Sequence, residues 1–493
     1  MAILLWRGRK RCSPAIVRCS LTTLMQMQRM KPLNLLTLSP FAFLLAVIQV
    51  AIAQAAQPPR PSGPAVIDHL NPSPNPLLRP SYPKEVAIQL NQPITLQQAL
   101  ELGLRNNKEV QVQRLTVERY RASFREAQGA SYPTLKLDST LQRSQSASDP
   151  LNTISDSFTS TLSLSYDLFT AGKRPAAIQA AALNLRYQEL ELERLTIQNQ
   201  VDIATAYYDS QKADENVRIQ TSAVTNAEQS LRDTQAKEAA GTGTRFDTLQ
   251  AQVTLANARQ DLVSAQATQD IDRRKLVQLL SLGQSVNVTA GDPVVVSGTW
   301  NLSLEESIVL AFKNRADPEQ QLVQREVSQQ QRRSELAAIR PTVSLSANYE
   351  ALKDLDTSSS FTDGYSVSGT ASWTLFDGGA AKAKARQQER NVEIYETQFA
   401  SQLNQIRYAV EENYANLQSN LDNIRTTEIA VGQAQEALKL ARLRYQAGVG
   451  TQTDVISAET SLTQAEGNRV NAIIGYNQSL ASLTGAVGYP LSK

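Results

Sequence analysis

Two segments of the chain alternate apolar and polar positions with a period of two. Residues 157–168 and 365–376 show this alternation, and a shorter stretch of the same kind precedes each of them. The period predicts β-strands with one apolar and one polar face. We therefore expect two β-hairpins, at 134–169 and 342–376, whose strands of about ten residues match the span of a bilayer. An ordinary sheet with its apolar face on a core is an equal alternative, because a barrel signal is weak in each strand.

A very long helical pattern follows each predicted β-hairpin. Between Pro175 and Ala239 the sequence has no glycine and no further proline. In the second such region apolar residues stand seven apart, which is typical of a coiled-coil seam: Leu403, Val410, Leu417, Ile424, Val431, Leu438 and Tyr445. We expect long helical hairpins at 173–283 and 380–485, packed side by side as a thin wall or bundle.

The two regions belong to one unit that occurs twice. ITLQQALELGLRNN from Ile94 echoes LSLEESIVLAFKNR from Leu302, and YDLFTAGKR from Tyr166 echoes WTLFDGGAA from Trp373. The offset between matching segments is 207 or 208 residues throughout. We therefore predict two repeats, at 94–290 and 302–485, each with a short helix, a β-hairpin and a long helical hairpin.

Glycine-rich segments, AGTGTRFDT from Ala240 and AGVGTQTDV from Ala447, interrupt the two helical patterns. A phosphate-binding loop would need a strand before it and a Gly-Lys-Ser/Thr signature, and neither is present. The segments instead predict tight turns between helices. In each turn a glycine ends one helix in the left-handed conformation, a threonine caps the next, and an aspartate stands three residues later.

The first 53 residues have the composition of a secretory signal peptide. They contain seven basic and no acidic residues, then an apolar run that ends in Ala51-Ile52-Ala53. A basic flank, an apolar core and small residues two apart predict cleavage near residues 53–55, with a transmembrane anchor as the alternative. Residues 54–93 hold half of the chain's 20 prolines and predict an extended linker.

The remaining composition argues against most catalytic chemistry. Residues 54–493 carry 42 basic and 47 acidic side chains, so no basic surface for nucleic acid is expected. The two cysteines, Cys12 and Cys19, lie in the predicted signal peptide, and the single histidine, His69, lies in the linker. The sequence therefore predicts no enzyme activity, no cofactor and no metal site.

Four membrane-spanning strands cannot close a barrel, because an open sheet would leave unpaired edges in lipid. Several chains must share one barrel, and three would supply twelve strands. At this point the repeated motifs LxLxxAlxLxxxN, LFxxG and AGxGTxxDxL, found between Ile94 and Gly485, resemble the TolC family of outer membrane efflux proteins.

The resemblance implies a mainly α fold with β structure. In this family a homotrimer forms a 12-stranded outer membrane β-barrel that continues into a 12-helix periplasmic α-barrel tunnel. The far end of the tunnel docks on a periplasmic adaptor protein and an inner membrane pump or ABC-type secretion ATPase. The implied function is passive export of small molecules or proteins through an outer membrane exit duct.

The resemblance also assigns site residues. The adaptor-facing helical tips would be Gly241, Gly243, Thr244, Gly448, Gly450 and Thr451. Asp454 and its counterpart Asp247 would line the channel aperture. Independently of the resemblance, the position of Arg245 next to the first cap predicts that it pairs with an acid of a neighbouring helix and helps to hold the aperture shut. A second acidic ring one turn later is absent, since Ser457 stands there. The simpler interpretation of both aspartates is an acid that stabilises a helix start, and Arg245 is equally well a solvated charge.

Aromatic residues in and beside the predicted strands suggest a girdle at the membrane interface: Phe158, Tyr166, Phe169, Tyr349, Tyr365, Trp373 and Phe376. Packing within an ordinary sheet is the alternative for these side chains. Two other kinds of protein also stay open on the sequence alone, namely a secreted coiled-coil scaffold and the periplasmic adaptor itself.

Overall fold

The computed structural model describes residues 70, 77, 79–88, 90–145, 154–283, 285–356 and 360–491. All of them belong to one compact unit, Ile67–Lys493. The predicted signal peptide and its cleavage site lie outside the described residues. So do residues 54–69 of the predicted linker.

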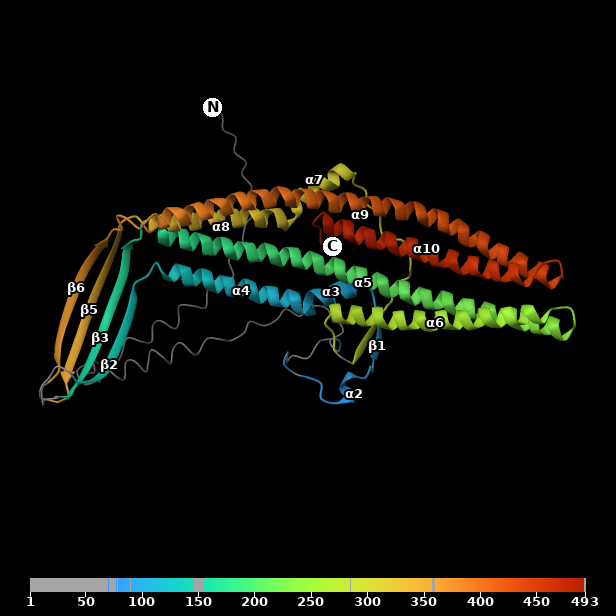
Figure 1. Cartoon of the computed structure of the whole chain (residues 1–493), viewed down its shortest axis with the longest axis horizontal. Coiled ribbons are helices and arrows are strands. Elements are labelled where there is room, and N and C mark those ends of the chain that lie inside the picture. The colour runs from blue at the N-terminus through green and yellow to red at the C-terminus, as the bar shows by residue number, and fades with distance from the viewer. Residues whose placement is uncertain are drawn as a thin grey trace, which may run out of the picture. The chain divides into compact units, whose positions relative to one another are not determined.

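The described chain is mostly helical, with two small sheets (Figure 1). The first half contains α2 (Pro83–Val86), β1 (Leu90–Ile94), α3 (Leu96–Asn106), α4 (Lys108–Gly129), β2 (Thr134–Gln145), β3 (Ile154–Phe169), α5 (Lys173–Ala239), α6 (Arg245–Leu279) and β4 (Val286–Ala290). The second half contains α7 (Leu304–Asn314), α8 (Ala316–Ala337), β5 (Thr342–Asp354), β6 (Thr362–Ser372), α9 (Ala380–Gln446) and α10 (Gln452–Ala486).

The larger sheet has the antiparallel order β2-β3-β5-β6. Its register places the apolar positions of all four strands in common rows across one face. One row is Leu135, Leu164, Ala347 and Val367, and the next is Leu137, Leu162, Tyr349 and Tyr365. The intervening row, Lys136, Ser163, Asn348 and Ser366, belongs to the polar face.

The apolar face of this sheet is not covered by any described part of the chain. Leu135 and Val367 are 66% and 67% exposed, although buried side chains of this type contribute most of the stability of a soluble sheet. The alternative of an ordinary sheet packed on a core therefore does not describe this structure. Each of the outer strands, β2 and β6, pairs with only one described strand, so the sheet has two open edges.

The second β-hairpin is shorter than the alternation predicts. Strand β6 ends at Ser372, which pairs with Thr342 at the start of β5. Beyond Ser372 no residue of β5 remains to pair with, so Trp373 and Phe376 lie in the connection to α9 rather than in a strand. The predicted end of this hairpin at residue 376 was wrong by four residues.

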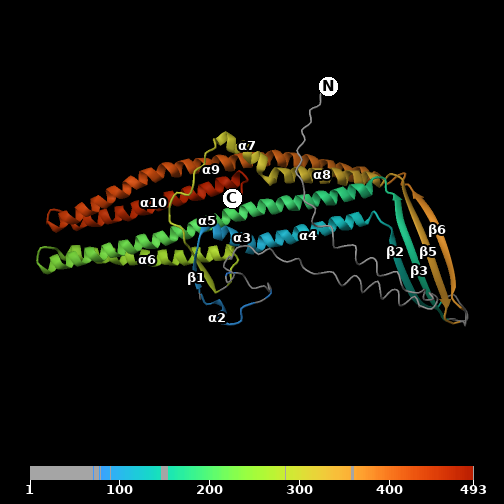
Figure 2. The ribbon, with the colours of Figure 1, turned by 180° about the vertical axis from the view of Figure 1, so that it is seen from behind.

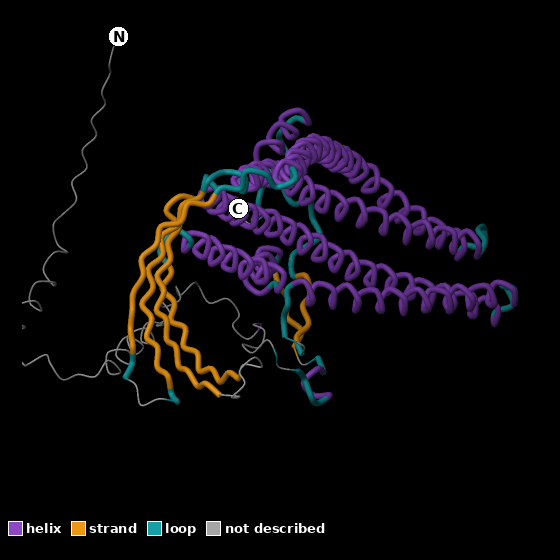
Figure 3. Tube along the Cα trace, turned by 60° about the vertical axis from the view of Figure 1, so that its left-hand side comes forward, coloured by secondary structure: helices purple, strands orange, loops and turns teal. Residues whose placement is uncertain are grey.

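The long helices pack side by side. α5 contacts α4, α6, α8 and α10, while α9 contacts α8 and α10 (Figure 1). With 67 residues each, α5 and α9 are roughly 100 Å long at the usual rise per residue. Val410, Leu417, Leu438 and Tyr445 of the seven-residue seam are buried. The sheet adjoins one end of these helices, and the turns α5–α6 and α9–α10 lie together at the other end (Figures 2 and 3).

A second sheet includes residues 90–93, which the sequence assigned to the linker, and β4 of the first repeat. β1 pairs in parallel with β4 over five residues. Pro93 is tolerated because a two-stranded sheet leaves an edge at which a missing N–H costs little. The phenol oxygen of the fully buried Tyr207 lies within hydrogen-bond distance of the Ile94 carbonyl (3.1 Å) and of the Asp292 carboxylate (2.8 Å), and its single O–H can donate to either, which fixes this sheet against α5. The prediction of an extended linker was therefore wrong for residues 90–93, which form part of β1.

Among the described residues, none of the helices combines the length and the apolar character that crossing a membrane requires.

Candidate functional site at the helical tips

The turn between α5 and α6 is built by local hydrogen bonds. Gly241 adopts a left-handed conformation (φ +74°), which lets the amides of Thr242 and Gly243 donate to the Lys237 carbonyl at 2.9 and 3.0 Å. Thr244 then caps α6. The Asp247 amide donates to Thr244 Oγ1 (3.2 Å), and the Thr244 amide donates back to the Asp247 carboxylate (3.3 Å).

The turn between α9 and α10 has the same construction. Gly448 has φ +79°, and the amides of Val449 and Gly450 both donate to the Arg444 carbonyl at 3.0 Å. Thr451 caps α10 by accepting from the Asp454 amide at 3.2 Å, and its own amide donates to the Asp454 carboxylate at 2.9 Å. The predicted roles of the glycines, threonines and aspartates as helix ends and caps are confirmed.

Each turn also needs its second glycine, for a steric reason. A Cβ added to Gly243 would lie 2.9 Å from the Lys237 Cβ, and one added to Gly450 would lie 3.0 Å from the Arg444 Cβ. The first contact is shorter than carbon atoms tolerate, and the second would force the neighbouring helix end to shift by a few tenths of an ångström. The two turns are therefore specified almost completely by local sequence.

The surroundings of the two turns differ, because α5 packs against the second hairpin. The Lys237 ammonium donates to the Tyr445 carbonyl and lies 3.9 Å from the centre of the Tyr445 ring. About two turns earlier along α5, Ser230 accepts a hydrogen bond from the buried Gln452 of α10 at 2.6 Å. Two residues at the end of α5 and start of α10 thus join the hairpins at their tips.

A third junction contains a buried carboxylate. Arg442 of α9 donates to Asn226 of α5 (3.0 Å) and to Glu459 of α10 (2.9 Å). The Glu459 side chain is only 9% exposed. Burial raises the pKa of Glu459, while the hydrogen bond from Arg442 opposes that rise. Glu459 is therefore enclosed among three helices and does not supply the missing second acidic ring.

The two predicted aperture aspartates have different surroundings. The Asp454 carboxylate is exposed, and its hydrogen bond from the Thr451 amide lowers its pKa. It lines a groove of about 350 Å³ together with Arg444 and Ser457. Asp247 is half-buried and faces the neighbouring hairpin. Burial raises the pKa of Tyr445 most, and the negative charge of Asp247 adds to that rise.

Arg245 pairs with an acid of the adjoining helix in its own hairpin. Its guanidinium lies 3.5 Å from Glu238 at the end of α5. The pair is largely exposed, and such pairs contribute little to stability. Sequence reasoning missed Lys237, Gln452 and Arg442 as residues that join the tips, because each contacts a partner more than 200 positions away, or belongs to no motif.

The predicted aromatic residues occupy several levels of the sheet. Tyr166 and Phe169 lie at the end of β3 that leads into α5, with Trp373 and Phe376 after the end of β6. Phe158 lies towards the end of the sheet that is far from the helices. Its ring packs edge-on against that of Phe361, with 6.3 Å between the ring centroids. Tyr349 and Tyr365 form a cross-strand pair within the sheet. The structure therefore groups four of the seven near the helices rather than placing all seven in one ring.

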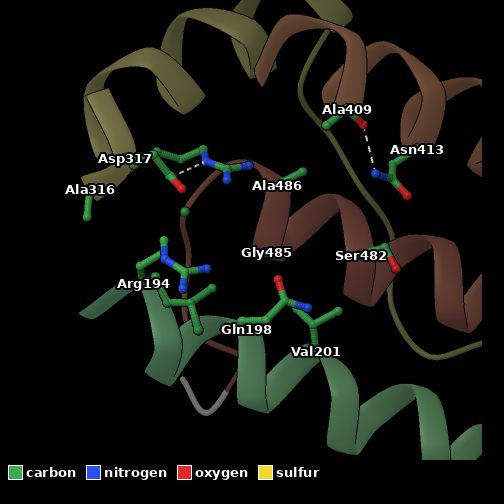
Figure 4. Close-up of a pocket in the computed structure, with 13 residues that line it drawn as sticks. Arg194, Gln198, Val201, Ala316, Asp317, Ala409, Asn413, Ser482, Gly485 and Ala486 are labelled. Carbon is green, nitrogen blue, oxygen red and sulfur yellow. Dashed lines mark hydrogen bonds and ion pairs between the residues drawn. The ribbon is translucent and has the colours of Figure 1, made fainter. Parts of the chain in front are cut away.

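A cavity of about 290 Å³ lies further along the helices, where α5, α8, α9 and α10 meet (Figure 4). Its arginines are neutralised: Arg315 pairs with Asp317 at 2.8 Å, and Arg194 pairs with Glu191 at 2.6 Å. Gly485 of α10 lies so close to α5 that an added Cβ would be 2.4 Å from Val201. These features indicate a structural junction between helices. Within the described part of the chain, no cluster of three or more potential metal ligands occurs.

Comparison with known proteins identifies the class to which this fold and these tips belong. The family model for outer membrane efflux proteins matches residues 97–282 and 308–489. The chain belongs to the outer membrane efflux protein family. It is an outer membrane exit duct, and a transport protein rather than an enzyme.

Individual relatives share this assignment. The chain is 26% identical over 369 residues to the pyoverdine export outer membrane protein OpmQ of Pseudomonas aeruginosa, covering 73% of this chain and 75% of OpmQ. It is 25% identical over 345 residues to the alkaline protease secretion protein AprF of the same organism, covering 66% and 69%.

Solved structures show the same fold. The outer membrane protein VceC of Vibrio cholerae superposes with a TM-score of 0.69 at 23% identity, over 80% of this chain and 96% of VceC. The outer membrane channel CmeC of Campylobacter jejuni gives a TM-score of 0.71 at 17% identity, over 86% and 96%.

Proposed function

We propose that three copies of the chain assemble into one continuous duct with twelve strands and twelve tip helices. The observation that carries the proposal is the sheet: four strands with one uncovered apolar face and two open edges. In lipid every backbone polar group must be paired, so β6 of one copy must pair with β2 of the next. At the other end of each copy, α5, α6, α9 and α10 would supply four helices to the tunnel wall.

Equal element lengths support an origin by internal duplication. α5 and α9 have 67 residues each, and α6 and α10 have 35 each. The two repeats would then occupy 94–290 and 302–485, with the second sheet of β1 and β4 added to the first.

The helical tips would form the periplasmic entrance. Contacts of Lys237, Gln452 and Arg442 hold the two hairpins of one copy together, which supports a closed entrance in this conformation. The exposed turns at Gly241–Thr244 and Gly448–Thr451 would face the periplasmic adaptor. The adaptor in turn would connect the duct to an inner membrane pump or an ABC-type secretion ATPase.

The partner pump, rather than the duct, would determine which class of substrate is exported. The two relatives named above serve pyoverdine export and alkaline protease secretion, so both small molecules and proteins are candidates for this chain. The polar inner face of the sheet would allow passive passage of either.

The exposed carboxylate of Asp454 would contribute to cation binding at the entrance, where three copies bring three charges near the axis. We expect Asp454→Ala to weaken the block of single-channel current by divalent or trivalent cations. Asp247→Ala is the matched variant, because its half-buried carboxylate faces the neighbouring hairpin and should change the block less. An unchanged block in Asp454→Ala would reject this role.

Extraction and conductance together separate the duct from a soluble scaffold or a periplasmic adaptor. The uncovered apolar rows predict that the exported chain is extracted from membranes only with detergent. After reconstitution into a planar bilayer it should give discrete ion-conducting steps. A chain released without detergent that forms no channels would favour the scaffold or adaptor.

A further inference from the structure

An arginine-lined cavity lies where the helices join the strands. It has a volume of about 670 Å³ and is formed by the first turns of α5 and the last turns of α8. Arg332, Arg333 and Arg340 line it, together with Gly172 and Pro175 of the α5 start. No acidic residue is among the lining side chains.

The three arginines lack an acidic partner within the described chain. Arg333 makes one hydrogen bond, to the neutral Gln330 at 3.3 Å. The nearby Glu335 forms an ion pair with Lys384 instead, with 3.8 Å between the ammonium and the carboxylate. Three guanidinium groups around one cavity repel one another, and an anion bound among them would remove that repulsion. The positive end of the α5 dipole adds to the same potential.

Two comparisons within the molecule show that this charge is not required by the fold. In the cavity of Figure 4 each arginine has a carboxylate partner. In the first repeat, the positions that correspond at an offset of 208 are Phe124, Arg125 and Tyr132, so only one of the three is basic. The three exposed arginines around one cavity therefore have no equivalent cluster in the first repeat, which suggests a ligand rather than a packing role.

The location of the cavity indicates the source of such a ligand. Arg340 stands two residues before the first residue of β5, and Gly172 stands three residues after the last residue of β3. The indole of Trp373 donates to the Ile339 carbonyl at 3.1 Å, directly beside Arg340. Tryptophan is enriched at membrane–water interfaces, so the cavity lies at the level of lipid headgroups on the helical side of the sheet.

We propose that this cavity binds a phosphate group. Guanidinium groups suit phosphate because their planar N–H donors form paired, charge-assisted hydrogen bonds with its oxygens. Two sources offer this chemistry: the headgroup of a phospholipid in the leaflet next to the helices, and a free phosphate in solution. The site goes beyond the duct function, since it would tether or orient the duct at the membrane boundary without contributing to conductance.

The test measures lipid binding by the purified full-length assembly in detergent, by native mass spectrometry. Phosphatidylglycerol is titrated against the wild type and against R332Q/R333Q/R340Q, and diacylglycerol serves as the phosphate-free probe. We expect wild type to retain phosphatidylglycerol and the triple variant to bind it at least tenfold more weakly, because charge-assisted bonds are lost. The control R425Q/R469Q removes two exposed arginines of α9 and α10 outside the cavity and should bind as wild type does.

Inorganic phosphate as a competitor distinguishes the sources. Displacement of the lipid at equal concentrations assigns the site to free phosphate, and resistance to displacement assigns it to the headgroup. Equal binding of phosphatidylglycerol by wild type and triple variant, or equal binding of diacylglycerol, would overturn the proposal. If the triple variant fails to assemble, the single variant R340Q tests the proposal instead. R340Q should weaken phosphatidylglycerol binding by a smaller factor, and unchanged binding would reject the site.

Discussion

The two helical turns at the tips have the same construction but different neighbours. Both use a left-handed glycine, a second glycine in a crowded position, a threonine cap and an aspartate at the third helical position. At an offset of 207, however, the exposed Arg245 corresponds to the buried Gln452, and the exposed Gln252 corresponds to the buried Glu459. The first turn faces solvent where the second contacts a neighbouring hairpin.

The difference shows that local sequence specifies the turn and long-range packing specifies its role. α5 lies between α6 and α10, so the second hairpin's inner positions are enclosed while the equivalent positions of the first hairpin stay open. In a trimer the open side of α6 is the surface available to the next copy. Substitutions at matched positions of the two hairpins test this difference.

The largest contrast is expected at Arg442 and its counterpart Gln235. Arg442→Ala would leave the Glu459 carboxylate, 9% exposed, without its cationic partner. We expect a loss of about 2–3 kcal/mol, below the range for full burial because the arginine itself is 31% exposed. The exposed Gln235→Ala should change stability by less than about 0.5 kcal/mol. Thermal unfolding in detergent measures both, and equal losses would contradict the comparison.

The crowded glycines should instead behave alike. Gly243→Ala and Gly450→Ala each force a Cβ against the helix that precedes the turn, so each should cost about 1–2 kcal/mol. Gly432→Ala in the middle of α9 is the control, because an added Cβ meets no atom within 4 Å and alanine favours helix. Chemical denaturation of the three variants tests this, and a large difference between the two turns would show that they are not equivalent.

Substitution of Lys237 and of its counterpart Arg444 distinguishes the effect of a contact between the hairpins from the effect of a positive charge at the tips. Lys237→Met removes the ammonium that contacts the Tyr445 carbonyl and ring, a loss of about 1 kcal/mol at the junction of the hairpins. We expect a higher fraction of open time in single-channel recordings. Arg444→Met removes a charge beside Asp454 but no contact between hairpins, so it should leave the open time unchanged.

The smallest effect concerns pH and Glu459. Because burial raises the pKa of Glu459, the folded chain holds this proton more tightly than the unfolded chain does. The stabilising contribution is complete below the ordinary glutamate pKa of 4.5 and is lost as pH rises through the raised value. The melting temperature of wild type relative to Glu459→Gln should therefore fall as pH rises above 4.5. Gln252→Glu, at the exposed counterpart, should show no such trend.

Sequence reasoning was most successful where neighbours along the chain determine the structure. The alternation in residues 157–168 reports a strand directly, and the glycine–threonine–aspartate pattern at Gly448 reports a turn whose hydrogen bonds span only a few residues. The extent of β6 depended on its partner strand, so its end was misplaced. β1 was hidden because prolines dominate the composition around it.

The residues that join the tips were beyond the sequence for a different reason. Arg442 and Asn226 are 216 positions apart, and Gln452 and Ser230 are 222 apart. No local pattern marks such pairs, because their proximity results from the packing of α5 against the second hairpin. The unneutralised arginines at the α5–α8 junction escaped notice for the same reason, since the missing carboxylate is a property of the space around them.

The central claim is that one copy supplies four strands to a barrel shared by three. Since Cys12 and Cys19 lie in the predicted signal peptide, engineered cysteines test it cleanly. Thr140→Cys on β2 is combined in turn with Ser366→Cys, Ser368→Cys and Thr370→Cys on β6, and membranes are oxidised before denaturing electrophoresis. The account predicts that one pair yields a ladder of linked chains that ends at three. The absence of intermolecular links in all pairs, or a ladder that extends beyond three chains, would contradict it.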